Sequence, residues 1–301
     1  MVAYQKHKMR WMFWLFIGLA MTALAGVCWS YLYSWTAHRR AGFYAEEVFD
    51  DPQVVELCLA IEHGNLRKME RLIEEGVDVN ARGRDNLTPL FWAFFGGHEE
   101  RMEVLLKHGA NPNISITKEY APASMPNGTS VTELAARAPF PGCFELVMEY
   151  GGDPNFVNPV SKRPLLFAVI SGFGDRMQRS RLLVDKGADV TVRDGQGYTA
   201  PFIAAISWAK CDVALFLLEA GADPSVPQSP DNIPLIVRLI LAEEHYGRYG
   251  KSPQKQREYQ ALLDWLVEHG ESLEDARTTA DYLSKTPREL RRKTPDVPPK
   301  N

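Results

Sequence analysis

A short glycine-led phrase recurs along the chain and constrains the fold more than any other feature of the sequence. The first two copies read Gly76-Val-Asp-Val-Asn80 and Gly109-Ala-Asn-Pro-Asn113, and later copies begin at Gly151, Gly187 and Gly221. The five glycines are 33, 42, 36 and 34 residues apart. A period of this length indicates a repeat protein, in which each unit buries its apolar face only by stacking on its neighbours.

Each copy of the phrase follows an apolar stretch with helical periodicity, such as the one that begins at Met102. A glycine after such a stretch can adopt the left-handed conformation that closes a helix, and Asp or Asn with Pro supports a tight turn. A second phrase opens the next unit, and its best copy is Thr88-Pro-Leu-Phe-Trp-Ala93, where Thr can cap a helix and Pro takes the first helical position. Each repeat is therefore predicted to be a helix pair with a turn or β-hairpin finger.

These phrases resemble ankyrin repeats in their period near 33, in the Thr-Pro-Leu opening and in the Gly-Ala-Asp-Pro-Asn close. The resemblance covers residues 52–275 and implies an all-α repeat solenoid. The six expected repeats span residues 52–84, 85–127, 128–160, 161–196, 197–230 and 231–275. Insertions are expected near Ile114–Gly128 and Glu243–Gln256. Residues 276–301 are expected to form a C-terminal cap and a disordered tail.

A run of 27 residues without a charged side chain, from Trp11 to Ala37, precedes the repeats. A helix needs about 20 residues to cross the hydrocarbon core of a membrane. We therefore predict one transmembrane helix over residues 11–37, with residues 38–51 as a linker. Three basic residues before the run and two after it favour a cytoplasmic N-terminus for residues 1–10. The body would then be periplasmic or extracytoplasmic, attached to the inner membrane through this helix in the lipid bilayer.

Two other interpretations of the N-terminal segment stay open. Ala23-Leu-Ala25 resembles a signal-peptidase site, although the apolar run continues beyond it, which favours an uncleaved anchor. Cys28 could belong to a lipoprotein signal, although Val27 stands where a small residue is usual. The four cysteines are too few for a disulfide scaffold, and free thiols count against an exported body.

We find no catalytic, cofactor-binding or metal-binding pattern in the sequence, so the chain is not expected to be an enzyme or to bind a small-molecule substrate. Histidines at matching helix ends are expected to cap or pack, and they are His63, His98, His108 and His269. The cysteines are too far apart for a zinc knuckle. The net charge of -4 argues against nucleic-acid binding.

The ankyrin resemblance implies protein recognition through the fingers and the concave helical face. Alignment of the repeats gives one candidate column near the end of each opening helix, made of Phe95, Arg137, Ile170, Ile206 and Ile240. Four of the five are apolar, so the column is either an exposed interface or part of the stacking core. Further candidates are Arg82 and Arg84 in the first finger, and Tyr120 in the first insertion.

A single anchor and an ankyrin body would place a protein-binding surface at a membrane. In this architecture, and in the stretch Asn86–Ala93, the chain is similar to bacterial ankyrin proteins encoded beside type VI secretion lipase effectors. That resemblance implies an immunity protein that blocks a secreted lipase by steric occlusion. The alternative is a membrane-tethered scaffold or stress-protection ankyrin protein with a different protein partner.

Overall fold

The computed structural model describes residues 44–119, 125–140, 142–224, 233–247 and 252–285. The predicted transmembrane segment 11–37, Tyr120 and the tail 286–301 lie outside these ranges. Across the described ranges, no helix is both long enough and apolar enough to cross a membrane. The same ranges form helices and contain no strand, only three isolated β-bridges in the fingers. The prediction of an all-helical repeat solenoid is confirmed.

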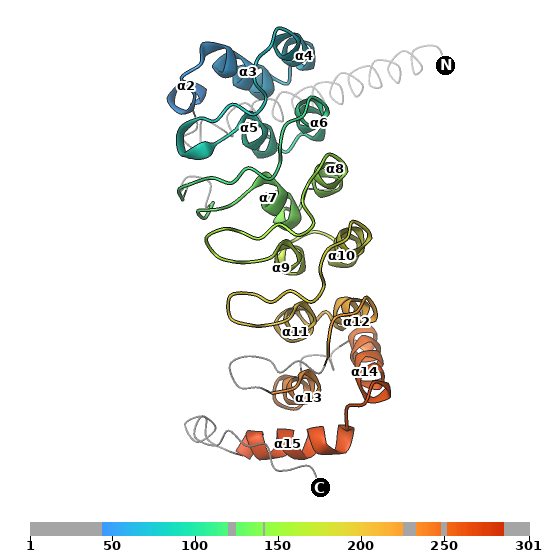
Figure 1. The fold of residues 1–301 in the computed structure, drawn as a ribbon. Coiled ribbons are helices and arrows are strands. Elements are labelled where there is room, and N and C mark those ends of the chain that lie inside the picture. The colour runs from blue at the N-terminus through green and yellow to red at the C-terminus, as the bar shows by residue number, and fades with distance from the viewer. Residues whose placement is uncertain (1–43, 120–124, 141, 225–232, 248–251, 286–301) are drawn as a thin grey trace, which may run out of the picture. The chain divides into compact units, whose positions relative to one another are not determined.

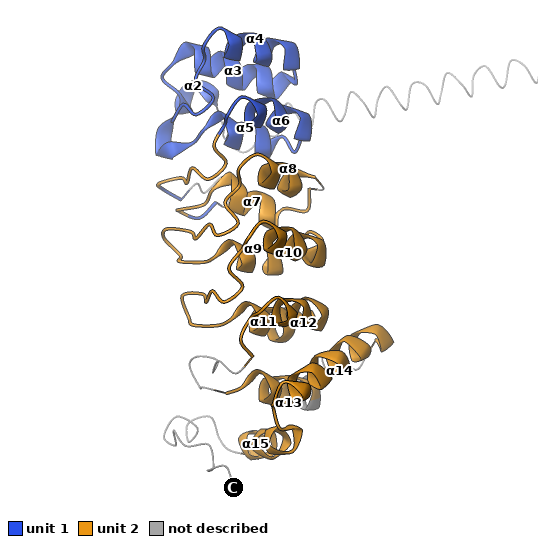
Figure 2. Ribbon diagram, turned by 45° about the vertical axis from the view of Figure 1, so that its right-hand side comes forward, with its two compact units in different colours: residues 1–110, 118–126 blue, residues 111–117, 127–301 orange. Residues whose placement is uncertain are grey.

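Contacts divide the chain into two compact units, coloured separately in Figure 2. Unit 1 comprises residues 1–110 and 118–126, and unit 2 comprises residues 111–117 and 127–301. Most of the expected insertion near Ile114–Gly128 therefore groups with unit 1, while its base groups with unit 2. In that base, Ile116 N donates to Thr129 O at 3.0 Å, and Gly128 N donates to Ile116 O at 3.0 Å.

Unit 1 contains the first two helix pairs (Figure 1). They are α3 (Pro52–His63) with α4 (Leu66–Glu74), and α5 (Pro89–Phe95) with α6 (Glu99–Lys107). A short helix, α2 (Ala45–Val48), packs on α3, and a 3-10 turn, η1 (Arg84–Asn86), lies in the first finger. Because α2 contributes the buried Ala45 and Val48, the folded body begins inside the predicted linker.

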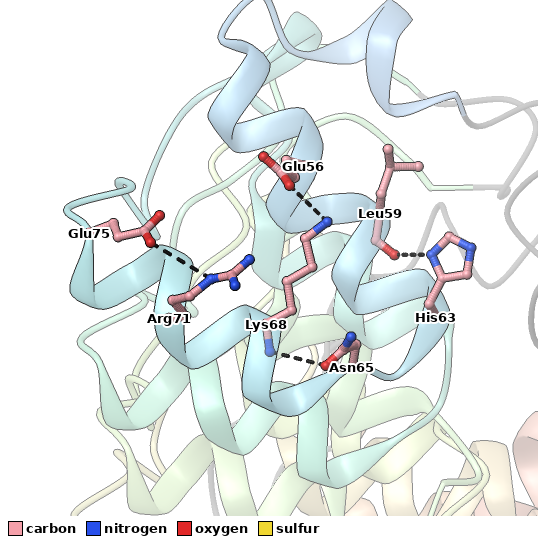
Figure 3. A network of polar contacts seen from close by, with 7 residues as sticks. All are labelled: Glu56, Leu59, His63, Asn65, Lys68, Arg71 and Glu75. Carbon is pink, nitrogen blue, oxygen red and sulfur yellow. Dashed lines mark hydrogen bonds and ion pairs between the residues drawn. The ribbon is translucent and has the colours of Figure 1, made fainter.

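Local capping explains the ends of the first helix pair. The Asp51 side chain accepts from Gln53 N at 2.8 Å, and α3 ends at Gly64 with φ 65°. Asn65 then accepts from Lys68 N at 3.1 Å and starts α4 (Figure 3). The ammonium of Lys68 also lies 2.8 Å from Glu56 Oε1, so it links α4 to α3.

Unit 2 contains the later helix pairs. They are α7 (Val131–Arg137) with α8 (Cys143–Glu149), α9 (Leu165–Ser171) with α10 (Arg176–Asp185), α11 (Ala200–Phe202) and the π-helix η3 (Ile203–Ser207) with α12 (Cys211–Glu219), and α13 (Leu235–Tyr246) with α14 (Pro253–Glu268). A final helix, α15 (Leu273–Lys285), packs on α13. The expected excursion near Glu243–Gln256 consists partly of helix, because α13 and α14 both extend into it. The predicted domain boundary at residue 275 falls within α15.

Asparagines of the turn phrase connect successive fingers within each unit. In unit 1, Asn80 Nδ2 donates to Gly109 O at 2.9 Å. In unit 2, Asn113 Nδ2 donates to Gly151 O at 2.8 Å, and Asn155 Nδ2 donates to Gly187 O at 3.1 Å. The last position of the phrase therefore holds neighbouring repeats in register, a role that helix closure and turn formation alone did not predict.

Asn113→Ala is expected to destabilise unit 2 by about 2 kcal/mol, because it removes three hydrogen bonds that each contribute roughly 0.5–1 kcal/mol at a partly exposed site. Besides its bond to Gly151, the Asn113 side chain accepts from Thr132 Oγ1 at 2.8 Å and from Asp153 N at 3.0 Å. Urea unfolding followed by circular dichroism measures the change. Asn155→Ala is the matched control and should cost less, because one contact to Gly187 and one from Asp189 N are lost there. Equal costs for the two variants would contradict this account.

Candidate functional site

The first finger presents two exposed arginines on a tightly defined backbone. Arg82 and Arg84 are both exposed, and Asp85 and Asn86 beside them adopt the left-handed conformation with φ 57° and 66°. Gly83 lies so close to α2 that an added Cβ would stand 2.5 Å from Val48 O. The finger is therefore seated on the segment before the first repeat, and both cations are available to a partner.

The candidate column divides between the surface and the core. Arg137, the last residue of α7, is exposed, while Phe95 at the end of α5 and Ile206 in the π-helix are half-buried. Ile170 exposes 0% of its surface and Ile240 exposes 4%. These two offer no area to a partner, so for them the core interpretation is the right one.

Packing explains why those two isoleucines are buried. Ile170 lies in α9, which packs against α7 on one side and against α11 and η3 on the other. Ile240 lies in α13, which packs against both η3 and α15. Tyr120, the candidate in the insertion, lies outside the described residues.

The histidines before the turn glycines cap helices, as predicted. In His63, His108 and His269, Nδ1 lies 2.6, 2.8 and 2.8 Å from the carbonyl oxygen four residues earlier. Figure 3 shows the first of these contacts, between His63 and Leu59. A ring N–H in this place gives a carbonyl of the last helical turn a second donor, besides the backbone N–H that it already accepts at Val104 and Trp265.

His98 differs from the other three because it is the N-cap residue of α6. Burial is the main cause that lowers the pKa of His98, and the nearby positive charge of Arg101 adds to it. Since its pKa is lower in the folded chain, the unfolded chain binds this proton more tightly. The resulting stability is present above about pH 6.5 and is lost as the pH falls through the folded pKa.

We therefore expect the free energy of unfolding of unit 1 to fall between pH 7 and pH 5, with a contribution from His98 that His98→Asn removes. Asparagine is a favourable N-cap residue and does not titrate. Urea unfolding across this pH range gives the slope of the free energy of unfolding against pH for the unmodified chain and for the variant. A His98→Asn slope as steep as that of the unmodified chain would rule out His98 as a source of the dependence.

The described cysteines, Cys58, Cys143 and Cys211, are buried and form no disulfide. Cys143 and Cys211 begin α8 and α12. Burial raises the pKa of the Cys58 thiol well above its usual value and that of Cys211 to about 12, and both are therefore poor nucleophiles. No group of three or more potential metal ligands occurs in the part of the chain that the structure describes.

Two buried arginines connect consecutive repeats and were missed by the sequence analysis. Arg101 exposes 7% of its surface and Arg179 exposes 3%. Arg101 donates to Glu62 O at 3.4 Å, and Arg179 donates to four carbonyls around the end of α7. Each arginine stands eight residues before a turn glycine, where the first repeat has Lys68 and the others have Cys143, Val213 and Leu262. A cation in a column that three repeats fill with an apolar residue is the signal that could have identified them.

The chain consists of stacked helix pairs whose successive fingers are joined by hydrogen bonds from asparagine side chains. This architecture defines a repeat protein of the binding-scaffold class. A family model described as ankyrin repeats matches residues 56–116 and 133–228 in three copies, which is just over half of the chain. The chain belongs to the ankyrin-repeat family. Such repeats form protein–protein interaction modules, and the family is generally not enzymatic.

Known proteins that resemble the chain are larger and varied. It is 27% identical over 169 residues to "Ankyrin repeat and KH domain-containing protein mask-1" of Caenorhabditis elegans, a match to 56% of this chain and 6% of that protein. It is 29% identical over 177 residues to "Palmitoyltransferase AKR1" of Lachancea kluyveri, a match to 58% of this chain and 23% of that protein. It is 33% identical over 72 residues to human "Ankyrin repeat domain-containing protein 40", a match to 24% of this chain and 20% of that protein. The chain thus spans less than a quarter of each of these relatives.

Proposed function

We propose that the chain is a membrane-anchored ankyrin module that blocks a secreted lipase effector by covering it, as an immunity protein does. The exposed pair Arg82 and Arg84 carries the proposal. Arginine is enriched among the residues that dominate binding energy in protein interfaces. Because the first finger is seated on α2, this pair is pre-organised and loses little freedom on binding.

Occlusion requires no chemistry from the ankyrin chain. A stable interface buries about 800 Å² on each partner, enough to cover the entrance of an enzyme's active site. Arg82 and Arg84 present their guanidinium groups at the first finger for such a contact. Carboxylates of the partner would pair with these guanidinium groups, whose planar fork suits bidentate hydrogen bonds.

The proposal places the anchor at residues 11–37 in the inner membrane and the body in the periplasm. Its support is the uncharged run and the basic residues that flank it. Alkaline phosphatase fused after Asn301 should be active, because this enzyme needs an exported location to form its disulfides. An inactive fusion that is present in normal amount would contradict a periplasmic body.

The partner is tested by purifying the full chain together with the lipase encoded by the neighbouring gene. We expect a complex, and we expect the Arg82→Glu, Arg84→Glu double variant to weaken it at least about 10-fold, as loss of a hot spot does. Lys186→Glu, an exposed charge reversal at the end of α10, is the control and should leave affinity unchanged. If deletion of the chain leaves cells unharmed by that lipase, the immunity role is excluded. Capture of a different neighbouring protein would favour the membrane-tethered scaffold or stress-protection role.

A further inference from the structure

Three consecutive repeats expose an aromatic side chain at the same place, the loop that joins the two helices of a pair. Phe140 lies between α7 and α8, Phe173 between α9 and α10, and Trp208 between η3 and α12. Their exposed fractions are 37%, 81% and 43%. We name this set of loops, residues 137–140, 172–176 and 208–210, the loop edge of unit 2. It lies at the opposite ends of the opening helices from the fingers (Figure 1).

Direct contacts join the three loops into one surface. Phe173 N donates to Arg137 O at 3.0 Å, and the guanidinium of Arg176 lies 5.1 Å from the centre of the Trp208 ring. An added Cβ at Gly172 would stand 2.8 Å from both Ala136 O and Arg137 Cα, so the first two loops are in close backbone contact. The three loops therefore form one continuous edge, and each of them carries one of the exposed aromatic side chains.

The backbone around Trp208 is unusual in two respects. The helix before it contains the π-helix η3, a form that occurs frequently at functional sites. Ala209, directly after it, adopts the left-handed conformation with φ 52° although it carries a side chain. Such a conformation costs of order 1 kcal/mol in a non-glycine residue. The fold therefore accepts local strain at a loop whose large apolar side chain faces solvent.

Cations outnumber anions on the loop edge. Each loop carries one cation: Arg137 is exposed, while Arg176 and Lys210 are half-buried. Asp175 is the one anion of these loops; it is exposed, and its carboxylate accepts from Gln178 N at 3.0 Å. Aromatic residues and arginine are the types that are enriched in protein interfaces and among their hot spots. A second copy of the same edge would bring like charges together and is disfavoured.

We infer that the loop edge is a second protein-binding surface, separate from the fingers, and that it binds an extended acidic segment of a partner protein. Packed helices are 8–10 Å apart, so three successive loops span about 20 Å. A polyproline II chain rises about 3.1 Å per residue and has three residues per turn, so about six residues cover that distance and every third side chain faces the same way. The segment would place an apolar side chain at every third position against the aromatic side chains, with carboxylates between them facing the cations.

The probe is a phage-displayed library of random ten-residue peptides, selected on the full chain held in nanodiscs of zwitterionic lipid. We expect the selected peptides to be rich in Asp and Glu and to carry apolar residues three positions apart. Trp208→Ala and Phe173→Ala should each weaken these peptides at least about 10-fold, as hot-spot truncations do. Lys210→Glu should also weaken them, and it leaves α12 intact because an acidic residue is favourable at a helix N-terminus.

Val160→Ala is the matched control, because Val160 is an apolar side chain that is 56% exposed but lies in a finger. The Val160→Ala variant should bind the peptides as tightly as the unmodified chain. The inference would be overturned if the selected peptides bound the Trp208→Ala and Phe173→Ala variants with the same affinity as the unmodified chain. It would also be overturned if the selected peptides lacked acidic residues, or if no peptide were selected. Displacement of the peptides by vesicles of anionic lipid would assign the edge to a lipid surface instead. The double variant at Arg82 and Arg84 should retain peptide binding, which separates this test from that of the proposed function.

Discussion

Replacing Arg179 by Met is expected to lower the free energy of unfolding of unit 2 by about 3 kcal/mol, the scale found when buried charged groups lose their partners. Arg179 NH1 donates to Ala135 O, Ala136 O and Ala138 O at 3.3, 3.2 and 2.8 Å, and NH2 donates to Phe140 O at 3.1 Å. Methionine fills much of the same volume but donates nothing. The carbonyls at the end of α7 would then lose a donor while water still has little access to them.

The loss should be local, because repeats contact only their neighbours. Hydrogen exchange followed by mass spectrometry should show the strongest loss of protection in α7 and in the loop that holds Phe140. Arg179→Lys keeps one charge and three donors but not the planar fork. Its free energy of unfolding should therefore lie between those of the unmodified chain and the Arg179→Met variant. Because Arg179 supports the loop at Phe140, Arg179→Met should also weaken peptides bound at the loop edge.

Arg181→Met is the matched control on the same helix. Arg181 is exposed and lies 4.9 Å from the centre of the Phe216 ring, so its loss should cost about 0.5 kcal/mol. A stability change at Arg179 no larger than the change at Arg181 would show that the four carbonyls do not depend on this side chain.

The turn glycines explain how much of the fold could be predicted from sequence. Gly76, Gly109, Gly151, Gly187 and Gly221 all have positive φ, between 85° and 105°. A glycine that must be left-handed at a helix end leaves a signal in the sequence that needs no tertiary information. The repeat boundaries and the helix pairs followed from that signal. The histidine caps followed from it as well, since each contact lies within one helix.

The candidate surface was harder to predict, because exposure depends on the neighbouring repeat and not on the residue itself. Ile170 and Ile206 occupy the same column, but one is fully buried and the other is half-buried within a π-helix. The bulge changes the helical register after Ile203, and nothing in the local pattern of apolar residues indicates it. Arg179 could have been identified only by aligning the repeats on their glycines and asking why a cation stands in a column that Cys143, Val213 and Leu262 make apolar in other repeats. The anchor over residues 11–37 stays a prediction.

Replacing Trp92 by Phe is expected to destabilise unit 1 by about 2–3 kcal/mol, from the lost volume and the lost hydrogen bond to a buried carboxyl group. Trp92 exposes 1% of its surface, and its Nε1 donates to Glu62 Oε1 at 3.0 Å. Glu62 is itself 4% exposed and lies in the last turn of α3, where the helix dipole disfavours a carboxylate. The indole N–H therefore gives a hydrogen-bond partner to a buried carboxyl group at a helix end that does not favour its ionised form.

A double-mutant cycle separates the hydrogen bond from the volume. In a Glu62→Leu background no carboxylate needs the indole, so Trp92→Phe should cost only about 1 kcal/mol for its smaller ring. The difference between the two costs, about 1–2 kcal/mol, is the coupling between Trp92 and Glu62. Urea unfolding of the four chains, with hydrogen exchange in α3 and α5, measures it. Phe49 packs edge-to-face on Trp92 with ring centres 6.3 Å apart, so Phe49→Leu is a control that perturbs the same ring without touching the carboxylate. Equal costs of Trp92→Phe in both backgrounds would mean that the buried carboxylate gains nothing from the indole, and that Trp92 stabilises the second repeat by packing alone.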